Sequence, residues 1–236
     1  MSRLRTVLAL AAILPPLAAC GPKSGQRADS SSAAVSPPAS AASGAATPSA
    51  ATPDPRVTSA DQARIMGDPG APLWVVVVSD FQCPYCAQWE RQTAPQLIKE
   101  FVETGKVRLA FVNYPLRQHE NALPAAEAAM CAGAQGKFWE MHDQIFKSQE
   151  QWSPLPSSEA FFSALARQLA LDLPAYNTCI GQRTMRPMIE ADVQRATNGG
   201  ANSTPTFFIG NQVMAGAEPI QAFRDAIANA TAALPK

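Results

Sequence analysis

The stretch that decides the fold is Asp80-Phe81-Gln82-Cys83-Pro84-Tyr85-Cys86-Ala87-Gln88-Trp89. Before it, residues 73–78 form an apolar run with four consecutive valines, typical of a strand buried on both faces of an α/β sheet. After it, residues 87–103 predict a helix with a kink at Pro95. The two cysteines therefore stand where a buried strand turns into a helix N-terminus. Pro84 suits the first helical turn, because the N–H that it lacks would be unpaired there anyway.

This placement has a chemical consequence for the two thiols. Cys83 faces the unpaired N–H groups and the positive end of the helix dipole, and both favour the thiolate. Cys86 lies three residues further on, on the same side of the helix and within reach of a disulfide. A Cys-X-X-Cys pair at a helix start lowers the pKa of its first thiol from about 8.5 to roughly 3.5–7. Since thiolate is the attacking species in disulfide exchange, we predict Cys83 as the nucleophile and Cys86 as the resolving thiol.

Two other interpretations of the cysteine pair remain open. Half of a zinc site would need two more ligands, and the two histidines of the chain, His119 and His142, are isolated and far apart. A purely structural disulfide rarely has proline between its cysteines at a strand-to-helix turn. We therefore favour redox chemistry and predict no metal site. His142 lies in an aromatic-rich helix and is predicted to be core, whereas Tyr85 and Trp89 are predicted to shape a substrate surface.

Three separated motifs carry a resemblance to a known family: residues 80–86, residues 125–131 with 138–142, and residues 202–210. Together they resemble the DsbA-like branch of the thioredoxin-fold thiol:disulfide oxidoreductases, from about Val57 to the C-terminus. The resemblance implies an α/β protein, with a thioredoxin-like fold and a helical insertion between its second and third core strands. Tyr85 stands where the protein that names the family has histidine, so the resemblance does not imply strong oxidising power.

The resemblance also implies a role for Thr204-Pro205. Only about 5–6% of X–Pro bonds in folded proteins are cis, so the sequence by itself favours trans. Thioredoxin-like folds, however, keep a cis-proline beside the active-site cysteines. A cis turn would expose the backbone of Thr204 to an extended substrate strand. Pro84, Tyr85, Thr204 and Pro205 are therefore the residues that we expect to shape the active site.

The first twenty residues are predicted to form a signal peptide, with a basic start and an apolar run that is too short for a membrane span of about 20 residues. Its end, residues 17–20, resembles a bacterial lipobox, in which Cys20 would be lipidated. The alternative is an ordinary cleaved signal that leaves Cys20 as a stray cysteine. Gly21 after it favours, by the same resemblance, outer-membrane sorting in a Gram-negative cell.

Residues 21–55 are almost entirely Ala, Ser, Pro, Gly and Thr, and we predict a disordered tether. The globular domain is then 56–236. The chain has 19 basic and 19 acidic residues, which gives no electrostatic reason to expect nucleic-acid binding.

The rest of the domain continues the α/β pattern. Residues 106–114 predict a second core strand, and residues 206–209 with 212–214 a hairpin before a closing helix that runs to about Ala232. Between them, at about 118–198, lies the helical insert. Its predicted helices are 121–132, 136–149, 158–170, 174–180 and 183–197.

The insert contains the two remaining cysteines, Cys131 and Cys179. With Cys20 lipidated and Cys83 paired with Cys86, these two make the count even. In an oxidising exported compartment we expect them to form a structural disulfide, and two buried free thiols are the alternative. Closing a loop of about 49 residues would stabilise the fold by roughly 4 kcal/mol in the chain-entropy model.

These features predict an exported, lipid-anchored thiol:disulfide oxidoreductase on the periplasmic side of the cell envelope. It would need no cofactor, would act as a monomer, and would have reduced or unfolded exported proteins and a membrane redox partner as its partners. We rank oxidase first, reductase second and isomerase third, because isomerases usually dimerise through an N-terminal domain that is replaced here by a tether. A non-catalytic lipoprotein that carries copper on the thiolate pair is the alternative from another class.

Overall fold

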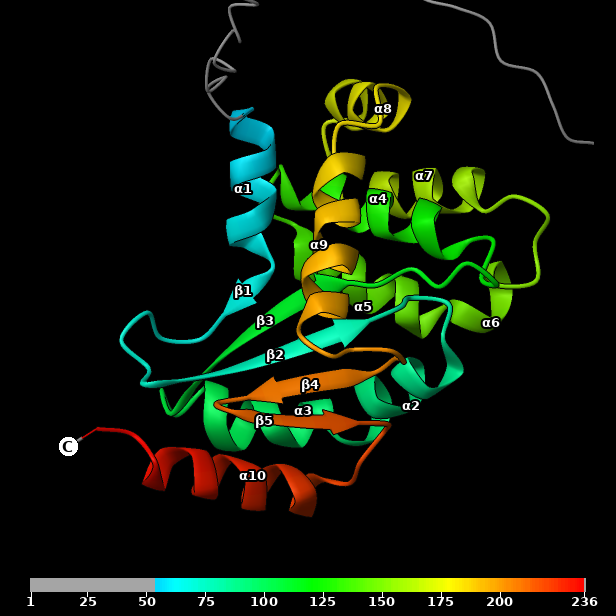
Figure 1. Cartoon of the computed structure of the whole chain (residues 1–236). Coiled ribbons are helices and arrows are strands. Elements are labelled where there is room, and N and C mark those ends of the chain that lie inside the picture. Colours follow the sequence, from blue (N-terminus) through cyan, green and yellow to red (C-terminus); the bar gives the residue numbers. More distant parts are fainter. Residues whose placement is uncertain (1–53, 236) are drawn as a thin grey trace, which may run out of the picture. The chain divides into compact units, whose positions relative to one another are not determined.

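The computed structural model describes residues 54–235, which form a five-stranded mixed sheet in the order β1-β3-β2-β4-β5 (Figure 1). The central strand β2 pairs in parallel with β3 and antiparallel with β4, which places Val75 opposite both Leu109 and Ile209. The strands are β1 (Ile65–Met66), β2 (Leu73–Ser79), β3 (Val107–Asn113), β4 (Thr206–Ile209) and β5 (Gln212–Ala215). The leader, Cys20 and most of the predicted tether lie outside the described residues.

Most of the connection from β2 to β3 is helical. The helical part consists of α2 (Pro84–Gln92), α3 (Ala94–Leu97) and a π-helical turn, η1 (Ile98–Val102). The break between α2 and α3 falls at Thr93, two residues before Pro95, where a helix cannot continue undisturbed. Thr93 is fixed at this break by a hydrogen bond of 3.0 Å from its hydroxyl to the carbonyl oxygen of Glu218. The kink predicted at Pro95 is confirmed.

In its first half, the valine-rich strand β2 is buried on one of its two faces and partly exposed on the other. The prediction of a strand buried on both faces is wrong for this half. Leu73, Val75 and Val77 are fully buried on one face. On the other face Trp74 is 39% exposed and Val76 is half-buried. The reason is incomplete cover, because on this face buried partners pack only against Val78, at the end of the strand.

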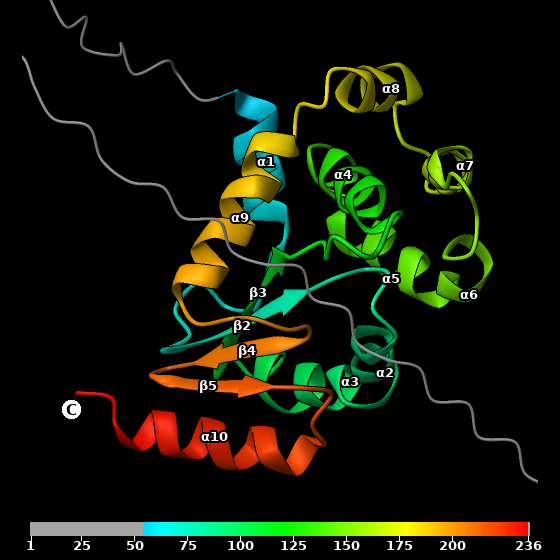
Figure 2. The same ribbon diagram turned by 45° about the vertical axis from the view of Figure 1, so that its right-hand side comes forward.

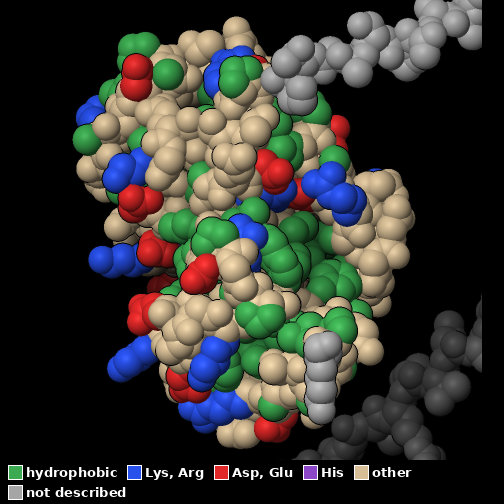
Figure 3. All heavy atoms as spheres, turned by 90° about the vertical axis from the view of Figure 1, so that its left-hand side faces the viewer, with side chains coloured by type: hydrophobic (Ala, Val, Ile, Leu, Met, Phe, Trp, Pro, Cys, Tyr) green, Lys and Arg blue, Asp and Glu red, His purple; other side chains and the backbone are tan. Residues whose placement is uncertain are grey.

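The half-covered face carries an apolar groove of about 320 Å³. It is lined by Val76, Val78, Val112, Arg195, Ala196, Gly199 and Phe208. Hydrophobic side chains gather in a hollow near the middle of the side of the molecule drawn in Figure 3.

The segment between β3 and β4 is a helical insert, as predicted. Figures 1 and 2 show α4, α5, α6 and α7 grouped beyond the ends of β2 and β3, whereas α9 runs back beside the sheet towards β4. The insert comprises α4 (Ala122–Gly133), α5 (Phe138–Lys147), α6 (Gln149–Trp152), α7 (Glu159–Gln168), α8 (Leu173–Gly181) and α9 (Arg186–Asn198). After the β4–β5 hairpin, α10 (Ile220–Ala232) packs against β2 and β4 and closes the chain. The α/β class with a helical insertion is confirmed.

Three elements were not predicted from the sequence: helix α1 (Pro55–Ala63), strand β1 and the short helix α6. The local signal for α1 is present, since Asp54 caps the helix by accepting a hydrogen bond of 2.9 Å from the Arg56 backbone N–H. Pro55 occupies the first helical position, which proline favours. The helix packs against α4 of the insert.

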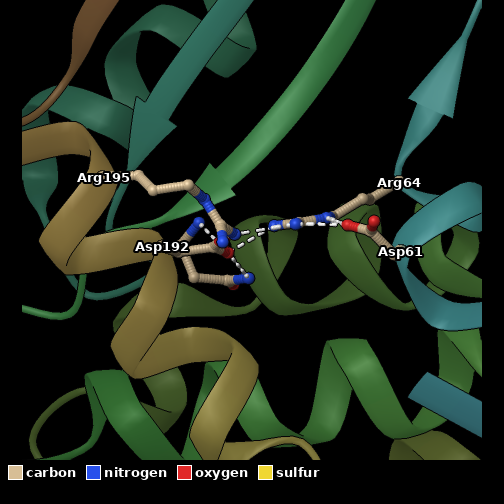
Figure 4. Close-up of polar contacts among 5 residues, drawn as sticks. Asp61, Arg64, Asp192 and Arg195 are labelled. Atoms are coloured by element: carbon tan, nitrogen blue, oxygen red, sulfur yellow. Dashed lines mark hydrogen bonds and ion pairs between the residues drawn. The ribbon is translucent and has the colours of Figure 1, made fainter. Parts of the chain in front are cut away.

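A buried ion-pair network joins α1 to α9 (Figure 4). Asp192 of α9 is fully buried and pairs with the guanidinium of Arg64, which is itself buried. The same carboxylate accepts hydrogen bonds from the backbone and side-chain amides of Asn113, at 3.2 and 3.1 Å, and from Arg195 at 2.7 Å. Asp61 binds the other side of Arg64. The network therefore ties the first helix of the domain to the end of β3 and to the insert.

Cys131 of α4 and Cys179 of α8 form a disulfide, with their Cα atoms 5.9 Å apart. Both residues are buried, and the bond joins two helices of the insert through cysteines that are 48 residues apart in sequence. None of the described helices is long and apolar enough to cross a membrane.

Removing this disulfide with Cys131→Ala and Cys179→Ala together is expected to lower the free energy of unfolding by about 2–4 kcal/mol, because the unfolded chain regains the freedom of the open loop. Urea unfolding of the double variant, compared with the intact protein under non-reducing conditions, measures this loss. A midpoint unchanged from that of the intact protein would contradict the prediction.

Candidate active site

The cysteine pair lies at the N-terminus of α2, directly after the end of β2. Cys83 is the N-cap residue of α2, with extended backbone angles of φ −69° and ψ 125°, and its carbonyl accepts the first helical hydrogen bond, from Ala87. Cys83 is 4% exposed and Cys86 is fully buried, and both are free thiols here. Tyr85 is 63% exposed, so the surface around the pair is formed partly by this side chain.

The loop before β4 brings Thr204 and Pro205 beside the pair. Because β4 runs antiparallel to β2, its start lies next to the end of β2, where the cysteines follow. The Cys83 thiol donates a hydrogen bond of 3.4 Å to the Thr204 carbonyl oxygen. The Thr204–Pro205 peptide bond is cis. The structure thus places the two separated motifs in direct contact.

The two thiols differ strongly in acidity. Hydrogen bonding from the Cys86 thiol, followed by contributions from the Thr204 side chain and from the backbone N–H groups of Cys86 and Tyr85, outweighs burial and lowers the pKa of Cys83 to about 6. Burial, with the nearby Cys83 sulfur as the next cause, raises the pKa of Cys86 well above its usual value. At neutral pH one thiolate therefore forms, at the less buried sulfur.

We expect the thiolate absorbance of the reduced protein to titrate with a midpoint near pH 6, measured against a Cys83→Ser variant as the blank. The pKa of Cys83 is lower in the folded protein than in the unfolded chain, so ionisation of this thiol stabilises the fold. This contribution to the free energy of unfolding is fully present above the pKa of about 8.5 in the unfolded chain and is lost as the pH falls through about 6. A single midpoint above pH 8 would contradict the assignment.

Behind the thiols lies a buried carboxylate that the sequence did not indicate as functional. The backbone N–H of Asp80 donates to the Cys86 sulfur at 3.5 Å. The Asp80 carboxylate accepts hydrogen bonds from Gln82 N at 2.7 Å, Leu116 N at 2.8 Å and His119 Nδ1 at 2.7 Å. Burial raises the pKa of this carboxyl above its ordinary value. His119 is thus connected to the cysteine pair through a single residue, Asp80. The spacing of these residues in the sequence does not reveal this contact.

Trp89 does not shape the surface, and that prediction is wrong. It is 1% exposed and packs against Phe207 and Phe223, with ring centroids 4.8 and 6.0 Å apart. Trp89 follows the buried Cys86 by three positions, and residues with this spacing lie on the same face of a helix. The side chain of Trp89 therefore points towards the core, like that of Cys86.

His142 is buried among aromatic rings, as predicted. Its Nε2 lies 3.2 Å from Glu90 Oε1, on α2. Burial alone would lower the pKa of His142, but the carboxylates of Glu90 and Asp143 overcome it and raise the pKa to about 9. The charged ring therefore links the insert to the helix that carries the cysteines. Among the described residues no group of three acidic, histidine or cysteine side chains is arranged to hold a metal ion.

A cysteine pair at the start of a helix that follows a central parallel strand, next to a cis-proline loop, defines a thioredoxin-fold protein of the redox type. The chain belongs to the thioredoxin family, whose model, described as "Thioredoxin", matches residues 59–229. The resemblance to the DsbA-like branch is confirmed.

Two named proteins are similar in sequence to parts of this chain. A protein of Bacillus anthracis named "Probable disulfide bond formation protein D" is 27% identical over 150 residues, which cover 61% of this chain and 68% of that protein. A protein of Salinispora tropica named "Na(+)/H(+) antiporter NhaA 3" is 35% identical over 173 residues, or 73% of this chain. The chain spans only about a quarter of the length of that antiporter.

Solved structures share the fold. The crystal structure of Wolbachia pipientis α-DsbA1 has a TM-score of 0.65 at 24% identity, covering 72% of this chain and 90% of that one. Oxidised BdbD from Bacillus subtilis has a TM-score of 0.64 at 21% identity, covering 71% and 91%. Both support the DsbA-like arrangement of sheet and insert.

Proposed function

We propose that this protein is a thiol:disulfide oxidoreductase that introduces disulfides into exported proteins, with Cys83 and Cys86 as its redox pair. The observation that carries the proposal is the contrast between the two thiols: Cys83 has a pKa of about 6, whereas the pKa of the buried Cys86 is raised. Such a contrast assigns one sulfur to external exchange and the other to resolution.

The reaction begins with the pair oxidised. A client thiolate attacks the Cys83 sulfur, the Cys83–Cys86 bond breaks, and Cys86 leaves with the electron pair and takes up a proton. The second client thiolate then attacks the client sulfur of the mixed disulfide. A client disulfide forms and Cys83 departs as a thiolate, which its low pKa favours because a more acidic thiol is the better leaving group. Two electrons have passed to the protein, and a membrane redox partner would remove them.

The surroundings of the pair suit a protein client. Tyr85 is well exposed beside Cys83, and the backbone of Thr204 lies against the same sulfur. An extended client segment would bind along the loop 202–205 by backbone hydrogen bonds, with Pro84 and Tyr85 contacting its side chains. The protein would act as a monomer and need no cofactor for this exchange.

Export and lipid anchoring at Cys20 are part of the proposal. The disulfide between Cys131 and Cys179 suits an oxidising compartment, where such bonds persist. Cys20→Ala should release the protein from the membrane fraction of its host, and unchanged fractionation would refute the anchor. The domain division proposed is a signal peptide at 1–20, a tether at 21–55 and the redox domain at 56–236.

The reduction potential decides between oxidase and reductase. Equilibration with glutathione buffers, followed by thiol trapping, should give a value closer to the oxidant range of about −120 mV than to that of thioredoxin, about −270 mV. Oxidation of a dithiol peptide should turn over many times when an oxidant is supplied. Insulin reduction with a potential near −270 mV would favour a reductase, and stoichiometric copper binding without exchange would refute the enzyme.

A further inference from the structure

The loop of residues 80–83 between β2 and α2, called the redox loop below, is hydrogen-bonded to the insert through one buried amide, that of Gln149. Gln149, at the start of α6, is buried, and its Nε2 donates to two carbonyl oxygens, that of Phe81 at 2.8 Å and that of Cys83 at 3.0 Å. An amide nitrogen has two hydrogens, so both are used. Within the described part of the chain, no other hydrogen bond reaches the carbonyl of Phe81.

Gln149 is itself held firmly. Trp152, on the same short helix, is fully buried and donates from Nε1 to the Ile145 carbonyl at 2.8 Å. Its ring packs against Phe162, with centroids 5.1 Å apart. The side chain of Gln149 therefore extends from a fixed point of the insert and does not merely follow the redox loop.

A second tie reinforces the first. The side chain of Gln82 donates to the Ser153 carbonyl at 3.1 Å and accepts from the Asn121 backbone N–H at 2.8 Å. Three successive residues of the redox loop, 81 to 83, are thus bonded to the insert. Of these bonds, the one from Gln149 to the Cys83 carbonyl reaches the N-cap cysteine itself.

We propose that Gln149 is a positioning residue for thiol–disulfide exchange: its buried amide bridges the carbonyls of Phe81 and Cys83 and so fixes the Cys83 sulfur at the helix N-terminus. The proposal rests on the proposed function. Because the Cys83 carbonyl also accepts from Ala87, the bridge fixes the first turn of α2 as well as the loop. The amide hydrogens add partial positive charge at this helix end, which favours a thiolate there.

The experiment compares Gln149→Met, which keeps the shape but removes both donors, with Gln151→Met, at an exposed position of the same helix. For Gln149→Met we expect the thiolate midpoint of Cys83 to rise and the rate of reaction with oxidised glutathione at pH 7 to fall about 5-fold, as the loss of hydrogen bonds to a buried site does. Gln151→Met should stay within about 2-fold of the unsubstituted protein. Circular dichroism establishes that each variant is folded.

Gln149→Glu supplies a readout that a general loss of stability would not move. As a carboxylate it offers no donor to the two carbonyls, whereas the protonated acid can donate one hydrogen bond. Its rate, divided by that of the unsubstituted protein at each pH, should therefore recover as the pH falls. A ratio that stays constant with pH would overturn the proposal.

Other outcomes are equally decisive. If folded Gln149→Met matches the unsubstituted protein in midpoint and rate, the proposal is wrong. If Gln149→Met does not fold, the pH dependence of the rate ratio for Gln149→Glu tests the proposal instead. If neither variant folds, Gln149 is needed for folding of the domain and the positioning role is refuted. Failure of the unsubstituted protein to exchange disulfides at all would instead refute the proposed function, and the thiolate midpoint would still test the bridge.

Discussion

Replacing Cys83 with serine is expected to lower the rate of disulfide exchange by a factor of roughly 10³ or more, as removal of a nucleophile does. Serine has the shape of cysteine, but its hydroxyl does not ionise near neutral pH and cannot form a mixed disulfide. Cys86→Ser should behave differently, because Cys83 keeps its place at the helix N-terminus. Its Cys83 thiolate should attack a client whose thiols are activated as mixed disulfides, displace the activating thiol and stay linked to the client, because no Cys86 thiol is present to release it.

The measurement is a non-reducing gel of each variant after incubation with a client whose thiols are activated as mixed disulfides. Cys86→Ser should give a client-linked band that dithiothreitol removes, and Cys83→Ser should give none. The matched control is the double variant Cys131→Ala with Cys179→Ala, which lacks the other cysteine pair and should retain exchange below its melting temperature. A client-linked band with Cys83→Ser would show that another sulfur attacks.

Asp192→Asn is expected to destabilise the domain by about 3–5 kcal/mol, because it removes the buried counter-charge of Arg64 and leaves this buried guanidinium only the half-exposed Asp61. The asparagine amide would also place hydrogens where the carboxylate accepts from Asn113. For a domain of this size, such a loss lowers the melting temperature by roughly 8–15 °C.

Arg195→Met is the matched control for this network. Arg195 pairs with the same carboxylate, but its side chain is 64% exposed, so its removal should cost less than about 1 kcal/mol. Thermal and urea unfolding of both variants test the contrast. Equal losses for the two substitutions would contradict the view that burial of the Arg64 charge dominates the energetics.

The parts of the fold that were predictable are those with a local cause. The valine run, the proline after Cys83 and the glycine-bounded hairpin each restrict the backbone directly, and β2, α2 and the β4–β5 hairpin follow. Helix α1 carried an equally local signal, Asp54 before Pro55, but it stands directly after a stretch without large apolar residues, which hid it.

The features that could not be predicted depend on which elements pack against each other. Whether the second face of β2 is covered depends on the path of α9, so Trp74 is exposed although its neighbours are buried. Trp89 was misplaced for the same reason, since its distance from the thiols says nothing about the side of α2 on which it lies. The contact of His119 with Asp80 and that of Gln149 with the redox loop join residues 39 and 66 or more positions apart, across the fold.

The arrangement of the sheet also implies an order of folding steps for a chain whose N-terminal part becomes available first. The central strand β2 needs β4 as a neighbour, yet Val75 and its partner Ile209 are separated by the whole insert. Cys131 and Cys179 are only 48 residues apart. Closing a short loop costs less entropy than closing a long one. The Cys131–Cys179 disulfide can therefore form before β4 pairs with β2. Maturation of the redox pair should therefore be the late step in the folding of this protein.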